Sequence, residues 1–385
     1  MNKILLHFFF SFLLLMSFSG IKSQSWVDSV ELNGREIYMP ADKYKWDWGQ
    51  ATFLNSLIHL YKTKSDTDKK IYFDYVQKAM EVSAGVANGK HPNAVASAHG
   101  IAFLARITGD KNYIDKANSI YADYLNIPRA SNGGVSHRAE TIELWDDTVY
   151  MLSMFLLEMY RLTGDEKYIA NFVEQFDAHN KELTDKKTGL WVHGWDADSV
   201  FYDDGCSIKN WPDKITHRND QIWARGNGWV GMALSDALET VTRSSKYWKP
   251  LEKAFVHYVS SVAPYQDKAT GHWYQLITLP NEPKNYLESS ATAMYAYTIV
   301  KGLQLNILNN KKYFPMVEKS YHGLRNLSMR NPSGTYLIPT RVSGGTCVGD
   351  KEYYLNRKIG EGTGFGYGSF IMFGLAYEQL TGKRK

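Results

Sequence analysis

The sequence predicts an all-α fold, a six-fold (α/α) barrel in which an inner and an outer ring of helices enclose one core. Three observations support this prediction. Helical spacing of apolar residues recurs along the chain, short Gly-Asp turns separate the helices, and no Pro/Ser-rich linker divides the 385 residues. A pair of helices with its turns takes about 55–60 residues, so six pairs account for residues 24–385.

Eleven segments carry apolar residues at the i, i+3, i+4 spacing that places them on one helix face. In chain order they are residues 48–61, 69–83, 94–107, 111–125, 143–162, 166–183, 222–242, 248–262, 287–308, 313–328 and 363–380. Paired helices that cannot bury such a face alone must stack or close into a ring. An open α-solenoid is therefore the alternative to the barrel.

The turns and loops favour the closed form. Residues 108–110 and 163–165 both read Thr-Gly-Asp, so that glycine ends one helix and aspartate caps the next. Long aromatic-rich loops connect several of the other helices, at residues 187–199, 201–220, 266–284 and 336–363. Long loops on a rigid scaffold commonly carry function, which is typical of a barrel with a working mouth.

The first residues predict an export signal. Lys3 precedes an apolar run at residues 4–16, and small polar residues follow it. The run is shorter than the about 20 residues that a membrane-spanning helix needs. We therefore expect removal of residues 1–23 after Ser23 and no membrane insertion afterwards. Residues 24–385 would then form one domain of a periplasmic or secreted protein.

The composition is that of a globular protein, with 44% hydrophobic and 22% charged residues. The net charge is +4, and basic residues are interspersed with acidic ones except in the tail at residues 382–385. Nucleic-acid binding requires clustered basic residues. We therefore expect no nucleic-acid partner, and we expect a monomer or a weak dimer.

No pattern in the sequence indicates a metal or a cofactor. The chain has neither a Cys-x-x-Cys pair nor a His-Glu-x-x-His motif. The glycine-rich run at residues 360–368 lacks the Gly-Lys-Ser/Thr of a phosphate-binding loop, and we expect it to let a loop approach the barrel mouth. Cys206 and Cys347 could pair in an oxidising compartment, but the sequence does not show whether they are neighbours.

Tryptophan is concentrated in unusual surroundings. Seven of the 11 Trp residues lie in five short segments that also hold Asp, His, Arg or Gly. These segments are residues 45–50, 143–147, 193–196, 223–229 and 271–275. Flat rings, carboxylates and a planar guanidinium together suit a carbohydrate ligand. A core rich in aromatic residues is the alternative, and we favour the carbohydrate-binding cavity.

These segments resemble glycoside hydrolase family 105, the unsaturated rhamnogalacturonyl and glucuronyl hydrolases, with family 88 a more distant relative. The similarity runs from about Trp46 to Leu380. It is most specific at residues 145–151, 193–196, 223–229 and 285–290. The resemblance implies a six-fold α/α barrel. It also implies removal of the Δ4,5-unsaturated uronic acid that polysaccharide lyases leave at the non-reducing end of an oligosaccharide.

The implied chemistry needs one carboxyl group. Protonation at C4 of the vinyl ether leaves a cation at C5, water adds there, and the hemiketal opens to release the partner sugar. Ordinary glycosidases instead use two carboxylates that flank the glycosidic bond. By the family motif, Asp147 is the acid toward C4 and then the base toward water. Asp146 is the near competitor for this role, and the alternative that we favour for it is an exposed or hydrogen-bonded helix cap.

The resemblance places further side chains around the reacting sugar. Arg225 is expected to clamp the uronate carboxylate, because a planar guanidinium binds it with two hydrogen bonds. Trp223 and Trp229 are expected to wall the sugar subsite.

Three other positions complete the expected site. His193 is expected to donate a hydrogen bond to the substrate. His137 is expected near the reacting sugar, ten residues before Asp147. Trp46 is expected at the rim of the cavity.

Asn93 marks a departure from the family pattern. Many members carry a second Asp at the start of the helix where this chain has Asn93, and Asn cannot exchange a proton. The departure puts a pectin-type substrate, unsaturated galacturonate on rhamnose, in doubt. We favour the ulvan-type substrate of marine members, unsaturated glucuronate linked to 3-sulfated rhamnose.

Two other classes of function stay open. An ordinary inverting glycosidase would need a second essential carboxylate, for which Asp47 and Asp196 are the candidates. A non-catalytic glycan-binding protein would explain the Trp residues but not the Trp-Asp-Asp sequence at residues 145–147.

Overall fold

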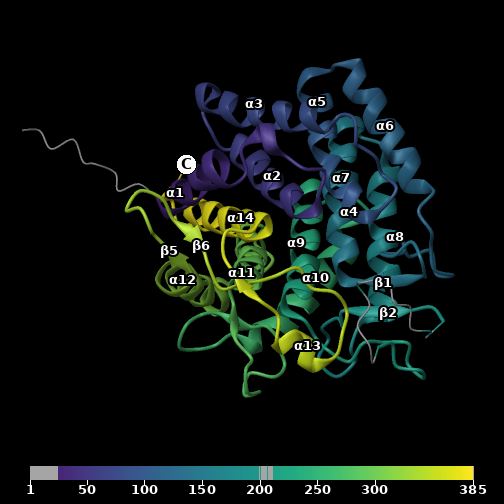
Figure 1. Cartoon of the computed structure of the whole chain (residues 1–385), viewed down its shortest axis with the longest axis vertical. Coiled ribbons are helices and arrows are strands. Elements are labelled where there is room, and N and C mark those ends of the chain that lie inside the picture. Colours follow the sequence, from purple (N-terminus) through teal and green to yellow (C-terminus); the bar gives the residue numbers. More distant parts are fainter. Residues whose placement is uncertain (1–24, 199, 201–205, 207–210, 385) are drawn as a thin grey trace, which may run out of the picture.

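The structure is a computed structural model that describes residues 25–198, 200, 206 and 211–384. The expected export signal at residues 1–23 and part of the expected loop at 201–220 lie outside the described residues. Within the described ranges, no helix is both long enough and apolar enough to cross a bilayer. Figure 1 shows that helices make up most of the chain, with short strands between them.

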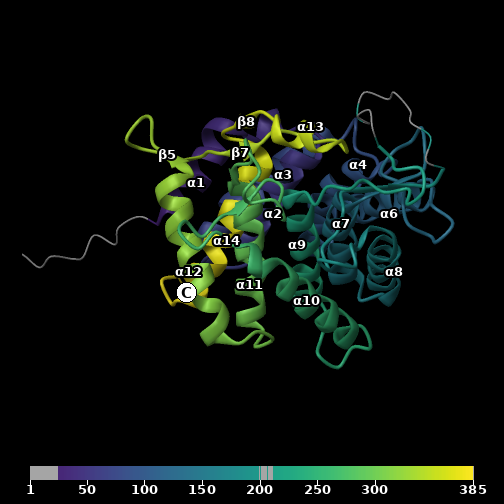
Figure 2. The same ribbon diagram turned by 90° about the horizontal axis from the view of Figure 1, so that it is seen from below.

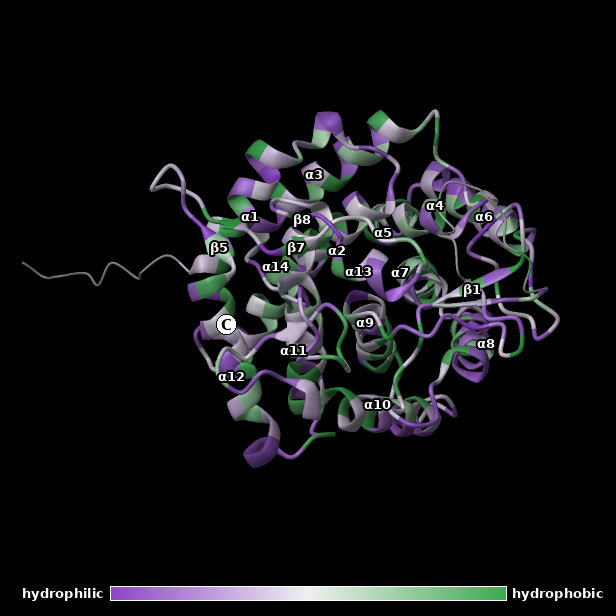
Figure 3. Ribbon diagram, turned by 60° about the horizontal axis from the view of Figure 1, so that its bottom comes forward, coloured by the Kyte–Doolittle hydropathy of each residue, from purple (hydrophilic) through white to green (hydrophobic). Residues whose placement is uncertain are grey.

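Six helices form an inner ring. They are α2 (Trp48–Tyr61), α5 (His99–Thr108), α7 (Asp146–Thr163), α9 (Ala224–Thr240), α11 (Ser289–Gln304) and α14 (Gly364–Leu380). Each packs against the next, and α14 packs against both α11 and α2, so the ring closes. Figure 3 shows these helices nearly end-on. The closed ring confirms the predicted (α/α) barrel and excludes the open solenoid.

Six further helices form the outer ring. They are α1 (Trp26–Asn33), α3 (Asp66–Ser83), α6 (Lys111–Leu125), α8 (Glu166–Leu183), α10 (Trp248–Val262) and α12 (Asn310–Leu327). Each covers one inner helix, α1 on α14, α3 on α2, α6 on α5, α8 on α7, α10 on α9 and α12 on α11. Five of the pairs are consecutive in the chain, as the sequence predicts. The sixth joins α14 to α1, a helix that the sequence prediction lacks.

The two rings differ in how their side chains are buried. Every residue of α11 from Ser289 to Leu303 is buried, whereas α6 buries only Ala117, Ile120 and Tyr124. A helix enclosed on all sides has no solvent face, and a surface helix keeps an apolar stripe. The sequence pattern is therefore clearest in the outer ring, where one face meets water.

The helix ends follow the predicted punctuation. Gly109 and Gly164 end α5 and α7 in the left-handed conformation, with φ of 68° and 69°. The side chains of Asp110 and Asp165 then accept hydrogen bonds from backbone N–H groups at the starts of α6 and α8. A left-handed C-cap residue favours glycine, and an aspartate N-cap satisfies a free backbone donor.

One predicted helix is divided. Residues 94–107 belong to α4 (Pro92–Ser97) and α5, which are separated at Ala98. His99 Nδ1 lies 2.6 Å from the carbonyl oxygen of Ala96. In an unbroken helix that oxygen would accept from the N–H group of Gly100. The histidine ring thus competes with the helix hydrogen bond at the break.

Other differences concern short elements. The predicted segments 143–162 and 287–308 begin with strands β1 (Glu143–Trp145) and β4 (Leu287–Glu288) before their helices start. Helices α1 and α13 (Lys351–Leu355) are absent from the prediction. Elements of this length are too short to show a reliable period in the sequence.

The N-terminal ends of the inner helices carry four two-stranded antiparallel sheets. They pair β1 with β2 (Gly194–Asp196), β3 (Trp273–Tyr274) with β4, β5 (Met329–Arg330) with β6 (Ile338–Pro339), and β7 (Val342–Ser343) with β8 (Ile359–Gly360). Figure 2 shows β7, β8 and α13 on this side of the helices. A disulfide joins Cys206 to Cys347, with Cα atoms 5.2 Å apart, which answers the question that the sequence leaves open.

Ring closure depends on two glycines where α14 meets α2. A Cβ atom at Gly364 would lie 2.3 Å from the carbonyl oxygen of Gly49, and one at Gly368 would lie 2.6 Å from that of Thr52. We expect Gly368→Ala to lower the free energy of unfolding by about 1–3 kcal/mol, because the added methyl group overpacks two helices. Urea denaturation measures the change.

Gly85→Ala is the matched control, because no atom lies within 4 Å of a Cβ at that position. It should leave stability unchanged or raise it by up to about 1 kcal/mol. Equal stability of the Gly368→Ala variant and the control would contradict the close approach of α14 and α2.

Candidate active site

The β1–β2 pairing brings two distant segments together. Its Cα partners are Glu143 with Asp196, Leu144 with Trp195, and Trp145 with Gly194. The register continues by one step, since the Asp146 N–H donates to the His193 carbonyl at 3.0 Å. His193 therefore lies beside the first turn of α7, although 46 residues separate it from Asp147.

Asp146 and Asp147 both lie in the first turn of α7, but they face different surroundings. Asp147 Oδ2 lies 3.1 Å from His193 Nε2, and the Asp147 side chain is 13% exposed. Asp146 is fully buried, and neither of its carboxyl oxygens accepts a hydrogen bond from a described residue. The expectation that Asp146 is an exposed or hydrogen-bonded cap is therefore wrong. Asp147 is the carboxyl group of the two that a substrate can reach.

His193 is held in one tautomer. Its Nδ1 lies 2.7 Å from the Tyr354 hydroxyl, which accepts from the Gly349 N–H at 3.3 Å and so keeps its own hydrogen for the imidazole. Nδ1 then accepts, and the ring proton sits on Nε2, where it donates to Asp147. Burial lowers the pKa of His193. The contact with Asp147 is accordingly a hydrogen bond from a neutral imidazole.

The two carboxyl groups have pKa values displaced in opposite directions. Burial, followed by the neighbouring Asp147, raises the pKa of Asp146 well above its usual value. Burial is the largest influence on Asp147 and raises its pKa, but the hydrogen bond from His193 together with the electrostatic effects of His193, His137 and Arg225 brings the pKa below its usual value. The N-terminus of α7 further favours an anion there. Of the two carboxyl groups, Asp146 is therefore the one that holds a proton more tightly.

His137 and Asn93 lie on the same side of the barrel as Asp147. His137 Nδ1 is 2.9 Å from Thr148 Oγ1, and its ring stacks on Trp145 with centroids 4.5 Å apart. Burial lowers the pKa of His137 well below its usual value. Asn93 is half-buried at the start of α4, where its N–H donates to His91 Nδ1. These contacts locate His137 and Asn93 near the start of α7, and their roles in substrate binding stay predictions.

Arg225 does not offer a free guanidinium. It is fully buried, and its Nη1 and Nη2 donate to the carbonyls of Ser343 and Gly344 at 2.8 and 2.7 Å. Glu288 lies 3.9 Å from Nη1. As placed, Arg225 organises the loop that follows β7. The predicted clamp on a uronate carboxylate would require these hydrogen bonds to be exchanged.

The tryptophans are mostly packing residues. Trp229 is fully buried and stacks on Tyr150 with centroids 5.0 Å apart, so it is not the predicted wall of a sugar subsite. Trp223 is 1% exposed and packs on His193 at 4.4 Å. Trp46 is half-buried, with its Nε1 donating to the Asn88 carbonyl. Of these three, only Trp46 has a partly open face.

Two residues of the site are missing from the sequence prediction. Tyr354 sets the tautomer of His193. Glu288 caps α11 by accepting from the Ala291 N–H at 2.6 Å, and it also accepts from the Ser343 N–H at 2.9 Å. An acidic residue directly before the helical pattern is a cap signal that could have identified Glu288. No local pattern distinguishes Tyr354 from the other tyrosines.

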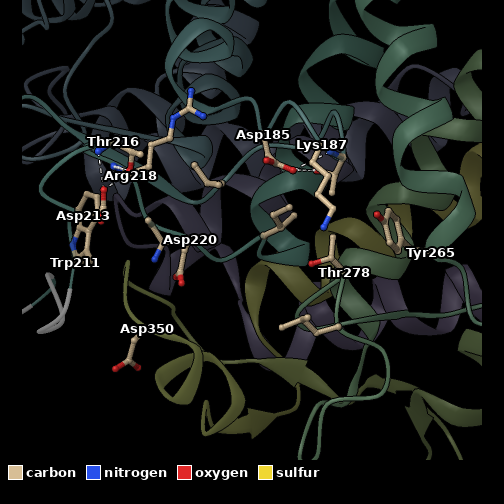
Figure 4. Close-up of a pocket in the computed structure, with 15 residues that line it drawn as sticks. Asp185, Lys187, Trp211, Asp213, Thr216, Arg218, Asp220, Tyr265, Thr278 and Asp350 are labelled. Carbon is tan, nitrogen blue, oxygen red and sulfur yellow. Dashed lines mark hydrogen bonds between the residues drawn. The ribbon is translucent and has the colours of Figure 1, made fainter.

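A cavity of about 860 Å³ lies at the same end of the barrel but does not include Asp147. Ile222 lines this cavity, whereas the next residue, Trp223, packs on His193. The cavity and the Asp147–His193 contact therefore lie on opposite sides of the segment at residues 222–223. Figure 4 shows its charged side chains: Asp185, Asp213, Asp220 and Asp350 with Lys187 and Arg218. The excess of carboxylates makes it unfavourable for a sulfated sugar.

Asp146, Asp147 and His193 also have ligand-type atoms within 4.8 Å of one another. Both nitrogens of His193 are already used, by Asp147 and Tyr354. Such an arrangement suits proton transfer better than metal binding. The expectation of no metal and no cofactor stays a prediction.

Comparison with known proteins decides the family. Residues 24–381 match the family described as Glycosyl Hydrolase Family 88. The chain belongs to Glycosyl Hydrolase Family 88. This family 88 chain is 25% identical over 316 residues to the unsaturated rhamnogalacturonyl hydrolase YesR of Bacillus subtilis (strain 168), covering 79% of this chain and 81% of that protein.

Two further similarities place the family 88 chain among its relatives. It is 26% identical over 180 residues to the unsaturated 3S-rhamnoglycuronyl hydrolase of Formosa agariphila, covering 47% of this chain and 45% of that one. The solved family 105 glycoside hydrolase of C. acetobutylicum ATCC 824 superposes with a TM-score of 0.79 at 23% identity, covering 92% of this chain and 100% of that one. The superposition confirms the barrel fold.

Tyr354→Phe tests the tautomer of His193. Without the hydroxyl group, Nδ1 loses its donor while Nε2–H keeps Asp147 as its acceptor, so we expect the resonance of the unprotonated Nδ1 to shift toward that of a free imine nitrogen. Nitrogen-15 chemical shifts of the imidazole report the protonated nitrogen directly. Tyr353→Phe is the matched control, because the Tyr353 hydroxyl accepts from the Cys347 N–H and makes no contact with His193. An unchanged His193 spectrum in Tyr354→Phe would contradict the assignment.

Proposed function

We propose that this chain removes the Δ4,5-unsaturated uronic acid from the non-reducing end of lyase-generated oligosaccharides. The observation that carries the proposal is the accessible carboxyl group of Asp147 at the N-terminus of α7, hydrogen-bonded to a neutral His193. A single carboxyl group of this kind can give a proton to C4 of the vinyl ether and then take one from the water that adds at C5.

The remaining carboxylates support this mechanism over ordinary inversion. Asp47 is exposed, and its Oδ1 caps α2 by accepting from the Gly49 N–H. Asp196 is buried in β2, and its Oδ1 accepts from the Asp198 N–H. Both candidates for a second catalytic carboxylate thus have structural roles. A vinyl ether needs no second carboxylate, which agrees with the site.

The family supports an enzyme over a glycan-binding protein. Relatives named unsaturated rhamnogalacturonyl hydrolase and unsaturated 3S-rhamnoglycuronyl hydrolase align with this chain. Most of the Trp residues that suggested flat binding platforms are buried, so the argument for simple glycan binding is weaker than the sequence indicated.

A further proposal concerns which sugar is linked to the unsaturated uronic acid. We favour unsaturated glucuronate on 3-sulfated rhamnose, because the resemblance matches Asn93 to a position where many family members carry Asp and because two relatives are named unsaturated 3S-rhamnoglycuronyl hydrolase. The second candidate is unsaturated galacturonate on rhamnose. It is favoured by the longer alignment with YesR, 316 residues against 180 for the Formosa agariphila enzyme.

One assay tests the activity and the partner sugar together. Lyase-generated ulvan and rhamnogalacturonan oligosaccharides are incubated with the protein, and the ultraviolet absorbance of the 4,5 double bond is followed. We expect the absorbance to fall, faster with the ulvan product. Release of a saturated sugar with the absorbance retained would indicate an ordinary glycosidase, and binding without turnover a glycan-binding protein.

Asp147→Asn should lower kcat by about a hundred- to ten-thousandfold, because the amide can neither give nor take the proton. The measurement is the rate of absorbance loss at saturating substrate. Asp47→Asn is the matched control, since asparagine also caps a helix and the inverting alternative is the only mechanism that needs Asp47. Normal turnover by Asp147→Asn would remove Asp147 from the mechanism.

We also propose that the protein is exported and that its signal ends at Ser23. The disulfide between Cys206 and Cys347 supports this proposal, because such bonds persist in oxidising compartments. N-terminal sequencing of protein expressed from the full-length gene should begin at Gln24. Recovery of intact protein with Met1 from the cytoplasmic fraction would contradict export.

A further inference from the structure

We infer that Asp146 and Asp147 form a proton-sharing pair, in which Asp146 holds the single proton in the resting protein and Asp147 delivers it to the substrate. Asp146 would then be a positioning residue that supplies the proton without touching the sugar. The inference deepens the proposed function and rests on it for the step at the substrate.

The Asp146 carboxyl group packs against a glycine of α9. A Cβ atom at Gly226 would lie 1.9 Å from Asp146 Oδ2 and 2.3 Å from Oδ1. The carboxyl group is therefore pressed against the backbone of the neighbouring inner helix. The side chain has no exposed surface, so water cannot solvate it there. This contact explains why position 226 holds glycine, since any side chain there would collide with the Asp146 carboxyl group.

Ionisation of Asp146 in this buried position would cost much free energy. Neither oxygen has a hydrogen bond of good geometry from a described residue, and His193 Nε2, at 3.8 Å, directs its proton to Asp147 instead. The backbone N–H of Asp147 offsets the burial only in part. A buried carboxylate with so little compensation for its lost hydration favours taking up a proton. A protonated Asp146 gains a donor, and the carboxylate of Asp147, which has an oxygen within 4.8 Å of a carboxyl oxygen of Asp146, is the acceptor beside it. Burial and the neighbouring Asp147 carboxylate accordingly raise the pKa of Asp146.

The other charged and titratable groups around Asp146 do not supply a counter-ion. Those that face it are Asp147 on α7, His193 before β2, Arg225 on α9, Tyr258 on α10, Tyr295 on α11 and Tyr354 on α13. Burial raises the pKa of each of these tyrosines, so they are neutral. Arg225 is positive, but its terminal nitrogens donate to the loop after β7 and it faces Glu288.

One catalytic turnover returns the pair to its starting protonation state. Asp146 passes its proton to the carboxylate of Asp147, and Asp147 gives that proton to C4 as the C4–H bond forms and the double bond becomes a cation at C5. Both carboxyl groups are then ionised beside the developing positive charge. The water that attacks C5 forms the C5–O bond and returns one proton to Asp147, and the proton relaxes to Asp146.

The pH profile of Asp146→Asn separates a proton store from a packing role. In the variant Asp147 must hold the proton alone, with a pKa below its usual value of 3.8. We expect kcat to fall by at least about a hundredfold at pH 7 and to recover about tenfold for each unit that the pH is lowered. A packing role predicts a lower kcat with the profile of the wild type, and that result would overturn the inference.

Asp236→Asn is the matched control. Asp236 is also a buried acid on α9, its Oδ1 accepts from the Tyr297 hydroxyl at 2.7 Å, and burial raises its pKa to about 6. It lies ten residues beyond Gly226, about 15 Å along the helix. The control should keep the pH profile of the wild type.

Infrared spectroscopy tests the proton without substrate. At pH 8 the wild type and Asp236→Asn should show the C=O stretch of a protonated carboxyl group, and Asp146→Asn should lack it. Asp147→Asn should keep the band at a shifted frequency, because its hydrogen-bond acceptor changes, and this variant serves if Asp146→Asn does not fold. A wild type without the band would overturn the inference. The band with no turnover of any unsaturated oligosaccharide would leave the pair intact and refute only the proposed function.

Discussion

The hydrogen bond between His193 and Asp147 depends on the backbone pairing of β1 with β2. The pairing places the His193 carbonyl on the Asp146 N–H, and this fixes the imidazole against the first turn of α7. From there the network extends outward through Tyr354, which comes from the short helix at the mouth. A two-stranded ribbon is weak by itself. Here it is held between the barrel below and the disulfide-linked loops above.

The aromatic residues stabilise the barrel more than they recognise a ligand. The inner helices are enclosed on all sides, so their interior must be filled by large side chains in fixed orientations. Trp229 between Tyr150 and Trp48 is one example, and Trp273, which donates to the Val262 carbonyl, is another. Three of the five segments in which Trp neighbours Asp, Arg or Gly lead into inner helices, and the other two lie in β2 and β3, which pair with the strands at those helix ends.

The sequence predicts the parts of this protein that are decided locally. The Gly109 and Gly164 helix ends and the outer-helix stripes follow from neighbouring residues, and the structure shows them where expected. The break at His99, the burial of Asp146 and the use of Arg225 to hold a loop are decided by groups far away in the chain. Asp147 was identified by resemblance to a family, and only the fold shows which proton it would use. No helical period distinguishes a carboxyl group that faces Gly226 from one that faces solvent.

Charge balance links the buried pair to the substrate. With Asp146 neutral, the charges of Asp147, Glu288 and Arg225 leave the site with one net negative charge before a ligand arrives. A uronate adds a second anion close to Asp147, and a like charge raises the pKa of a carboxyl group. The proton that Asp146 holds is then drawn toward Asp147, where it can reach C4. Binding of an anionic sugar would thus produce the protonated acid that the reaction needs, whereas a neutral sugar would leave the proton on Asp146. The uronate carboxylate is in this sense part of the acid catalyst as well as of the recognised ligand.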